Sequence, residues 1–207
     1  MTTPDGNDEK SRCAWAGSDP LYVHYHDSEW GRPVTADDAL FEKLCLEGFQ
    51  SGLAWITVLR KRERFRAVFH GFAIGKVAAM GDEDIERLVL DAGIIRHRGK
   101  IASTINNAKR ALEVQAEFGS FAAYVWRFEP HPSTRPDRLT AETLRTLAET
   151  EASRALSKDL RKRGFSFVGP TTCYAFMQAM GIVDDHLDSC FCRPEIEAIR
   201  QRLQRPA

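Results

Sequence analysis

The sequence lacks an excess of charge of either sign. Its 29 Lys and Arg side chains balance its 29 Asp and Glu side chains, so the formal net charge at pH 7 is zero. Whole-chain electrostatics therefore neither favour nor disfavour a nucleic-acid partner, and any basic surface has to be local.

Long apolar runs and strand patterns are also missing. Charges interrupt every apolar stretch before the roughly 20 residues of a membrane span, and the start, MTTPDGNDEKSR, contains no signal core. We therefore expect a cytoplasmic protein with no membrane partner. Because no segment alternates apolar with polar residues over a sustained length, we predict an all-α fold without a sheet.

Cysteines are few and odd in number, five in 207 residues. In a reducing compartment this count favours free thiols or metal ligands over a disulfide framework. Cys45 and Cys173 have apolar neighbours and are predicted to be small buried side chains. Cys13, Cys190 and Cys192 are left as candidate ligands.

The chain is long enough for one medium domain or two small lobes. We predict a disordered tail over residues 1–11, a folded region over 12–192, and a charged helix or tail over 193–207. Thr35 and Asp38 have capping-box spacing before an apolar stripe that is predicted to end near Gly48 or Gly52. Helical periods also predict helices at 53–72, 82–93 with Gly93 as a left-handed cap, 99–118, 120–128, 141–150 and 152–163.

Residues 162–181, KRGFSFVGPTTCYAFMQAMG, indicate two helices joined by a tight hairpin at about 164–172. The free N–H groups at the start of the second helix, with the positive end of its dipole, can bind one DNA phosphate. The alternative is an ordinary corner between helices. A second basic corner, DAGIIRHRGK, carries Arg96 and Lys100 and is either a phosphate clamp or a solvated loop.

Aromatic side chains crowd residues 12–31, where Trp15, Tyr22, Tyr25 and Trp30 follow no regular period. Such density builds either a core or a stacking pocket for a flat base. The segment CLEGFQSGLAW raises the same question for Trp55. Its Glu47 is a surface acid at a helix end or, if buried among aromatics, a carboxylate that needs a partner such as a cationic ligand.

His186 and Cys190 are four residues apart, which places both on one face if the segment is helical. With Cys13 and either His24 or His26 they can form a Cys2His2 zinc site between the two ends of the chain. Four protein ligands leave no open position, so such an ion would be structural.

The segments RCAW, DPLYVHYHDSEWG, FEKLCLEGFQSGLAWITVLRKRERFR, DAGIIRHRGKI and ALSKDLRKRGFSFVGPTTCYAFMQAMGIVDDH closely resemble bacterial 3-methyladenine DNA glycosylase I of the helix-hairpin-helix superfamily. The match runs from about residue 12 to 192. It implies an all-α glycosylase domain of two lobes with the lesion pocket between them. It also implies hydrolysis of the N-glycosidic bond of N3-methyladenine in alkylated double-stranded DNA, which leaves an abasic site. Nothing in the sequence requires more than a monomer.

The resemblance also implies roles for individual residues. It makes Glu47 the catalytic or base-recognising acid, with Tyr25, Trp55, Trp15, Tyr22 and Trp30 around the base. One structural zinc ion would join the two ends of the chain through Cys13, His26, His186 and Cys190, with Cys192 unassigned. The expected DNA contacts are Gly164, Gly169, Thr171 and Thr172 of the hairpin with Arg96 and Lys100.

Two positions bear on the chemistry. Bifunctional relatives carry a lysine just after the hairpin, where this chain has Thr171, so we predict no strand-nicking lyase activity. Asp184 stands where the family usually has Asn and the superfamily often has a catalytic acid. Two interpretations of Asp184 are therefore open: a helix N-cap before His186, or a catalyst.

The competing interpretations of the whole chain are a non-catalytic nucleic-acid-binding domain and a zinc hydrolase.

Overall fold

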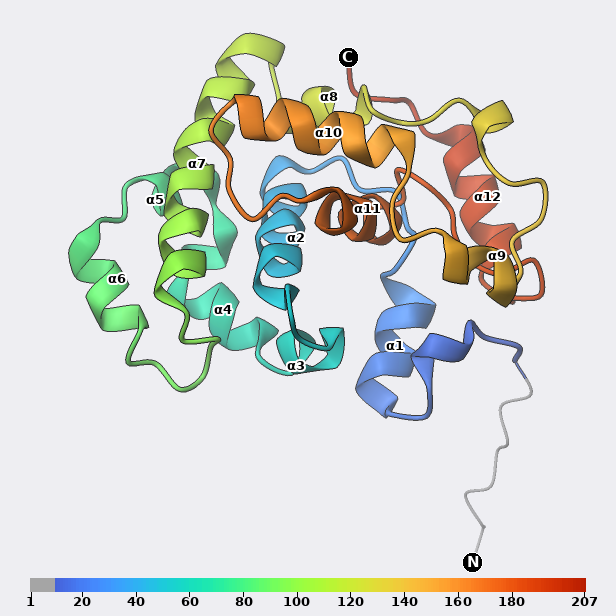
Figure 1. Cartoon of the computed structure of the whole chain (residues 1–207), viewed down its shortest axis with the longest axis horizontal. Coiled ribbons are helices and arrows are strands. Elements are labelled where there is room, and N and C mark those ends of the chain that lie inside the picture. Colours follow the sequence, from blue (N-terminus) through green and yellow to red (C-terminus); the bar gives the residue numbers. More distant parts are fainter. Residues whose placement is uncertain (1–9) are drawn as a thin grey trace, which may run out of the picture.

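The computed structural model describes residues 10–207, in which every regular element is a helix and no strand occurs (Figure 1). The all-α prediction is therefore confirmed, whereas most of the predicted N-terminal tail, residues 1–9, lies outside the described residues. Short 3₁₀ helices cover Ala14–Ala16, His70–Phe72 and Pro132–Thr134. The α-helices are α1 (Pro20–Ser28), α2 (Asp37–Gln50), α3 (Trp55–Leu59), α4 (Arg62–Val68), α5 (Ile74–Ala78), α6 (Asp82–Leu88), α7 (Arg98–Phe118), α8 (Phe121–Trp126), α9 (Ala141–Thr146), α10 (Glu151–Lys162), α11 (Pro170–Ala179) and α12 (Arg193–Arg202).

Helix α2 is the centre of the fold, between α7 and α11 in Figure 1 and in contact with both. The predicted apolar stripe is confirmed, since Leu40, Phe41, Leu44 and Cys45 are buried. The stripe pattern did not predict that the opposite face of the helix is buried as well. Between Lys43 and Phe49 the helix is buried on all sides, which brings the charged side chains of Lys43 and Glu47 into the interior.

The start of α2 differs from the prediction. Ala36 is its N-cap and makes no side-chain capping bond, so the capping box is wrong. Asp38 instead accepts a hydrogen bond from the Ile74 backbone N–H, and Asp37 accepts from the N–H groups of Phe121 and Ala122. The acids at the beginning of α2 thus fix α5 and α8 against it. The helix continues through Gly48 to Gln50.

Three other helix predictions need correction. The single helix expected over 53–72 is divided into α3, α4 and a 3₁₀ turn. Helix α6 ends at Leu88, and Gly93 does not adopt the left-handed conformation. Helix α1 was missed because its aromatic side chains follow no single stripe. Asp19, which accepts from the N–H groups of Leu21 and Tyr22 and precedes a proline, was the available signal for its start.

The hairpin between α10 and α11 is held against α7. Gly164 ends α10 with φ +86°, a left-handed conformation that favours glycine. Asn107 of α7 accepts a hydrogen bond from the N–H of Ser166 and donates one to its carbonyl. These bonds fix the loop just before α11 begins.

The C-terminal residues 193–202 form α12. Ile196 is buried, Glu195 makes a double hydrogen bond with Arg32, and Arg200 pairs with Glu129. Within residues 10–207, no helix has both the length and the apolar character needed to cross a membrane.

Candidate functional site

The five aromatic residues singled out in the sequence lie together around one cavity. The ring centroids of Trp15 lie 5.2 Å from Tyr22 and 5.0 Å from Trp30, and Tyr25 lies 5.4 Å from Trp55. These side chains line a cavity of about 240 Å³. Trp55 Nε1 is buried without a hydrogen-bond partner among residues 10–207, so a ligand with an acceptor atom can satisfy it.

Glu47 is buried beside this cavity, so the surface-acid interpretation is wrong. Its side chain is 5 % exposed, and Oε1 lies 2.8 Å from Lys43 Nζ. Lys43 also donates a 2.7 Å hydrogen bond to Tyr25 Oη, and its Nζ lies 3.2 Å from the centroid of the Trp55 ring. Sequence reasoning missed Lys43, although its position four residues before Glu47 placed both on one helix face.

A groove leads from the aromatic cavity toward the hairpin. A second cavity, of about 330 Å³, is lined by Glu47, the loop 51–53 after α2, and Thr171 and Thr172 at the start of α11. It shares the lining residues Gln50 and Ala175 with the aromatic cavity, so the two cavities are neighbours. Leu53, with 41 % of its surface exposed, lies on the loop at the rim. A ligand can therefore contact the aromatic rings, Glu47 and the first turn of α11 at once.

Gln178 of α11 also lines the aromatic cavity and was not predicted. Its Nε2 donates a 2.7 Å hydrogen bond to Asp185, which is fully buried and also accepts hydrogen bonds from Tyr174 and Arg135. Because the amide nitrogen is held from behind, the orientation of Gln178 is fixed by the protein. Its sequence context, an apolar helix, gave no signal for this role.

The residues that were predicted to contact DNA differ in their exposure to solvent. Thr171 is exposed in the first turn of α11, where backbone N–H groups have no acceptor within the helix. The side chain of Arg96 is exposed. Lys100 is instead buried, and its Nζ donates to the carbonyls of Phe49 and Ser51. Lys100 thus stabilises the end of α2, and its phosphate contact stays a prediction.

Cys13, His26, His186 and Cys190 form a buried cluster whose four ligand atoms lie within 4.8 Å of one another. Cys190 Sγ lies 3.4 Å from His186 Nδ1 and 3.6 Å from His26 Nε2, and Cys13 Sγ lies 3.7 Å from His186 Nδ1. Ligands around a tetrahedral zinc ion are about 3.3–3.8 Å apart, so the cluster fits a metal ion of that geometry.

The second nitrogen of each histidine ring in the cluster has its own partner. His26 Nδ1 lies 2.7 Å from Asp27 Oδ1, and His186 Nε2 lies 3.1 Å from the Trp30 carbonyl oxygen. Such partners orient imidazole ligands toward a metal. His24 is exposed and its ring contacts Ser28, so geometry selects His26. Residues 183–192 form irregular backbone and turns rather than the helix assumed for His186 and Cys190.

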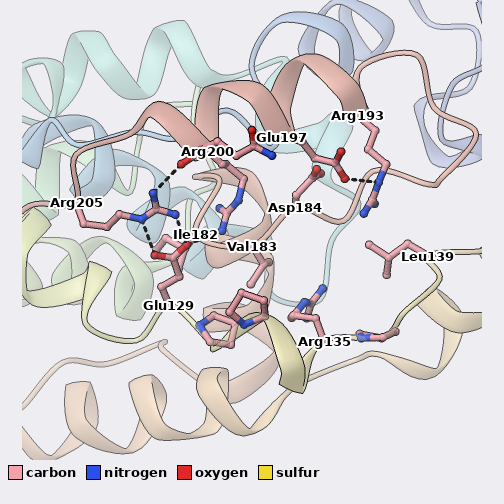
Figure 2. Close-up of a pocket in the computed structure, with 14 residues that line it drawn as sticks. Glu129, Arg135, Leu139, Ile182, Val183, Asp184, Arg193, Glu197, Arg200 and Arg205 are labelled. Atoms are coloured by element: carbon pink, nitrogen blue, oxygen red, sulfur yellow. Dashed lines mark hydrogen bonds and ion pairs between the residues drawn. The ribbon is translucent and has the colours of Figure 1, made fainter.

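Asp184 lies in a different cavity, of about 460 Å³, against α12 (Figure 2). Figure 2 shows it near Arg193 and Arg200, none of which lines the aromatic cavity. Asp184 Oδ1 accepts from the His186 N–H at 3.1 Å, and burial raises the pKa of its carboxyl group. Asp184 thus stabilises the turn that carries a cluster residue, although this turn is not a helix N-cap.

We expect the Asp184→Asn variant to retain most of the activity of the protein, because an amide oxygen can accept the same hydrogen bond from His186. Initial rates of the variant and the unchanged protein provide the measurement. A general acid or base typically contributes about 100-fold or more to the rate, so a loss of that size would make Asp184 a catalyst.

Comparison with known proteins supports one family. A family model described as methyladenine glycosylase matches residues 15–193. The chain is 55 % identical over 184 residues to DNA-3-methyladenine glycosylase 1 of Escherichia coli strain K12, covering 88 % of this chain and 97 % of that protein. A crystal structure of 3-methyladenine DNA glycosylase I is similar with a TM-score of 0.81 at 50 % identity, covering 88 % of this chain and 99 % of that one. A tyrosine-to-phenylalanine variant of such an enzyme, in complex with 3-methyladenine, gives a TM-score of 0.77 at 34 % identity over 88 % and 97 % of the two chains.

Proposed function

This chain belongs to the methyladenine glycosylase family, and we propose that it excises N3-methyladenine from alkylated double-stranded DNA, hydrolysing the N-glycosidic bond and leaving an abasic site. The buried carboxylate of Glu47, in a cavity next to the five-ring aromatic cavity, is the observation that supports this proposal. Excision of methyladenine itself is the activity named for its relatives at 55 % and 48 % identity.

The chemistry of the lesion matches these groups. Methylation at N3 makes the purine cationic, which weakens its bond to deoxyribose and makes it a good leaving group. The enzyme therefore has to flip the nucleotide out and bind the charged ring rather than protonate it. Aromatic faces attract a cation by about 0.5–2 kcal/mol, and the Glu47 carboxylate supplies the counter-charge while water attacks the sugar carbon.

The hairpin is proposed to hold the DNA backbone. In a two-lobed helix-hairpin-helix arrangement, Gly164, Gly169, Thr171 and Thr172 would place the N–H groups at the start of α11 on a phosphate. The groove supports this, because it runs from Glu47 to Thr171 and Thr172. Arg96 is exposed and available for a second phosphate. A monomer acting on chromosomal DNA in the cytoplasm suffices for this activity.

We further propose that the Cys/His cluster holds one structural zinc ion through Cys13, His26, His186 and Cys190. A bound ion would compensate the charge of the buried thiolates and join the two ends of the chain. His26 directly follows Tyr25 on α1, so fixing His26 also fixes one wall of the aromatic cavity. Four protein ligands leave no position for a reacting water, which argues against a zinc hydrolase.

We expect no lyase activity, because Thr171 has no amine that could attack the sugar carbon. Borohydride should trap no covalent complex between the protein and methylated duplex DNA, and strand breaks should appear only after alkali or heat opens the abasic sites. A trapped complex at enzyme-equivalent yield would instead reveal a nucleophilic amine elsewhere in the site.

Release of free N3-methyladenine from methylated duplex DNA tests the proposed function directly. The expected result is time-dependent release in proportion to protein concentration. If no base appears above the no-enzyme control while the protein still binds duplex DNA, the chain is a non-catalytic nucleic-acid-binding domain.

A further inference from the structure

A buried ammonium group lies at the centre of the recognition site. Lys43 Nζ contacts Glu47 Oε1 at 2.8 Å and Tyr25 Oη at 2.7 Å, and it lies 3.2 Å from the centroid of the Trp55 ring. These are the carboxylate and two of the rings that the proposed function assigns to the positive charge of the base. The protein thus holds a cation of its own against the groups that have to recognise one.

Lys43 contacts these groups but does not line the aromatic cavity. It lines a separate cavity of about 320 Å³, and the side chains of Tyr25 and Trp55 line both cavities. A base stacked in the aromatic cavity would therefore contact two rings that Lys43 also contacts. Glu47 would then interact with two positive charges, one supplied by the protein and one by the substrate.

We propose that Lys43 is a specificity-determining residue, an internal cation that competes with the charge of the alkylated base for Glu47, Tyr25 and Trp55. This inference rests on the proposed function. Two cations next to one carboxylate repel each other, and rings that interact with one cation attract a second less strongly. Lys43 in its ammonium form weakens the binding of a cationic base, and release of its proton to solvent strengthens that binding.

The surroundings of Lys43 allow its ammonium group to lose a proton at mildly alkaline pH. The charged and titratable side chains that face it are Glu47 on the same helix, Tyr25 on α1, Glu29 just after α1, Arg62 on α4, and the Arg66–Glu42 pair. Burial lowers the pKa of Lys43 to about 8. Burial raises the pKa of Tyr25 well above 10, so the tyrosine stays neutral. Burial acts to raise the pKa of Glu29, but the hydrogen bond from Arg62 keeps it below its usual range, so this acid stays ionised.

Because the cation binds better when Lys43 is neutral, affinity should be low below pH 8 and rise as the pH passes through that value. The probes are the 3,9-dimethyladenine cation, whose N9 methyl stands in for the sugar, and the neutral 9-methyladenine. Both are titrated calorimetrically from pH 6.5 to 9.5 into the unchanged protein and its variants. Lys43→Met is close to the lysine stem in size, and Lys43→Gln keeps a hydrogen-bond donor. Lys76→Met, at an exposed position, is the matched control.

We expect the unchanged protein to bind the cation about 10-fold more tightly at pH 9.5 than at pH 6.5. Both Lys43 variants should bind the cation about 10-fold more tightly than the unchanged protein at pH 7, without that pH dependence. Affinity for the neutral base and all properties of Lys76→Met should not change.

The inference is overturned if the Lys43 variants do not bind the cation more tightly, relative to the neutral base, than the unchanged protein does. It is also overturned if the affinity of the unchanged protein for the cation does not change with pH. Melting curves identify variants that fold, and the Gln variant carries the test if the Met variant does not. Excision of N3-methyladenine is measured on the same preparations. If the unchanged protein excises the base but the ratio stays constant, only the role of Lys43 is wrong; without any excision, the proposed function fails.

Discussion

Replacement of Glu47 by Gln is expected to lower kcat/KM for N3-methyladenine excision about 100-fold or more. The amide keeps the shape of the side chain but removes the negative charge that faces the cationic base. Because the aromatic rings are unchanged, the variant should keep the preference for a cationic base that the rings provide, about 0.5–2 kcal/mol, and lose the part that the carboxylate supplies. Initial rates on methylated duplex DNA, with KM separated from kcat, provide the measurement.

The control for this experiment is Glu113→Gln, which changes a half-exposed acid on α7. This variant should match the unchanged enzyme. A rate for Glu47→Gln within 10-fold of the unchanged enzyme would remove Glu47 from its proposed role. If excision then followed zinc content in a protein that remains folded, the metal would be the reactive centre.

Loss of a residue of the Cys/His cluster should lower the stability of the protein strongly. A structural zinc ion contributes about 10–16 kcal/mol of binding free energy, which is comparable with the entire stability of a typical domain. We expect Cys190→Ala and His186→Ala to lose zinc and to melt about 10 °C or more below the unchanged protein. Zinc content by mass spectrometry and thermal melting are measured on the same samples.

Cys192 offers a matched control, since it is buried next to the cluster but lies outside its four-residue set. Cys192→Ala should keep full zinc content and lose only the small stability of one buried thiol. An unchanged melting curve with full zinc in Cys190→Ala would contradict the assignment.

Local patterns predicted most of the helical architecture because most helices bury an apolar face that recurs in the sequence, whereas α9 buries no residue and α1 has no single stripe. They could not predict the surroundings of Lys43, since a stripe reports one face and α2 is buried on all sides from Lys43 to Phe49. Lys100 shows the same limit. Its basic neighbours indicated a phosphate contact, whereas its partners are carbonyls some 50 residues earlier in the chain.

The choice between His24 and His26 shows why part of the site depends on tertiary structure. Both precede Asp27 on α1 at similar spacing from Cys13, and only the arrival of residues 186–190 makes one of them a cluster member. The family resemblance identified His26 where spacing left two candidates. Asp184 was ambiguous for a related reason, because its cavity is completed by α12, which lies almost wholly beyond the matched family region.

All five cysteines are buried, with at most 4 % of any of them exposed. Reagents that methylate DNA bases also methylate thiolates, which are the most nucleophilic side chains in a protein. Burial raises the pKa of Cys173 to about 12 and that of Cys192 to about 12, which keeps both in the less reactive thiol form. The enzyme thus presents little of its own sulfur to the chemicals that create its substrate, and it can remain intact while the DNA around it is being damaged.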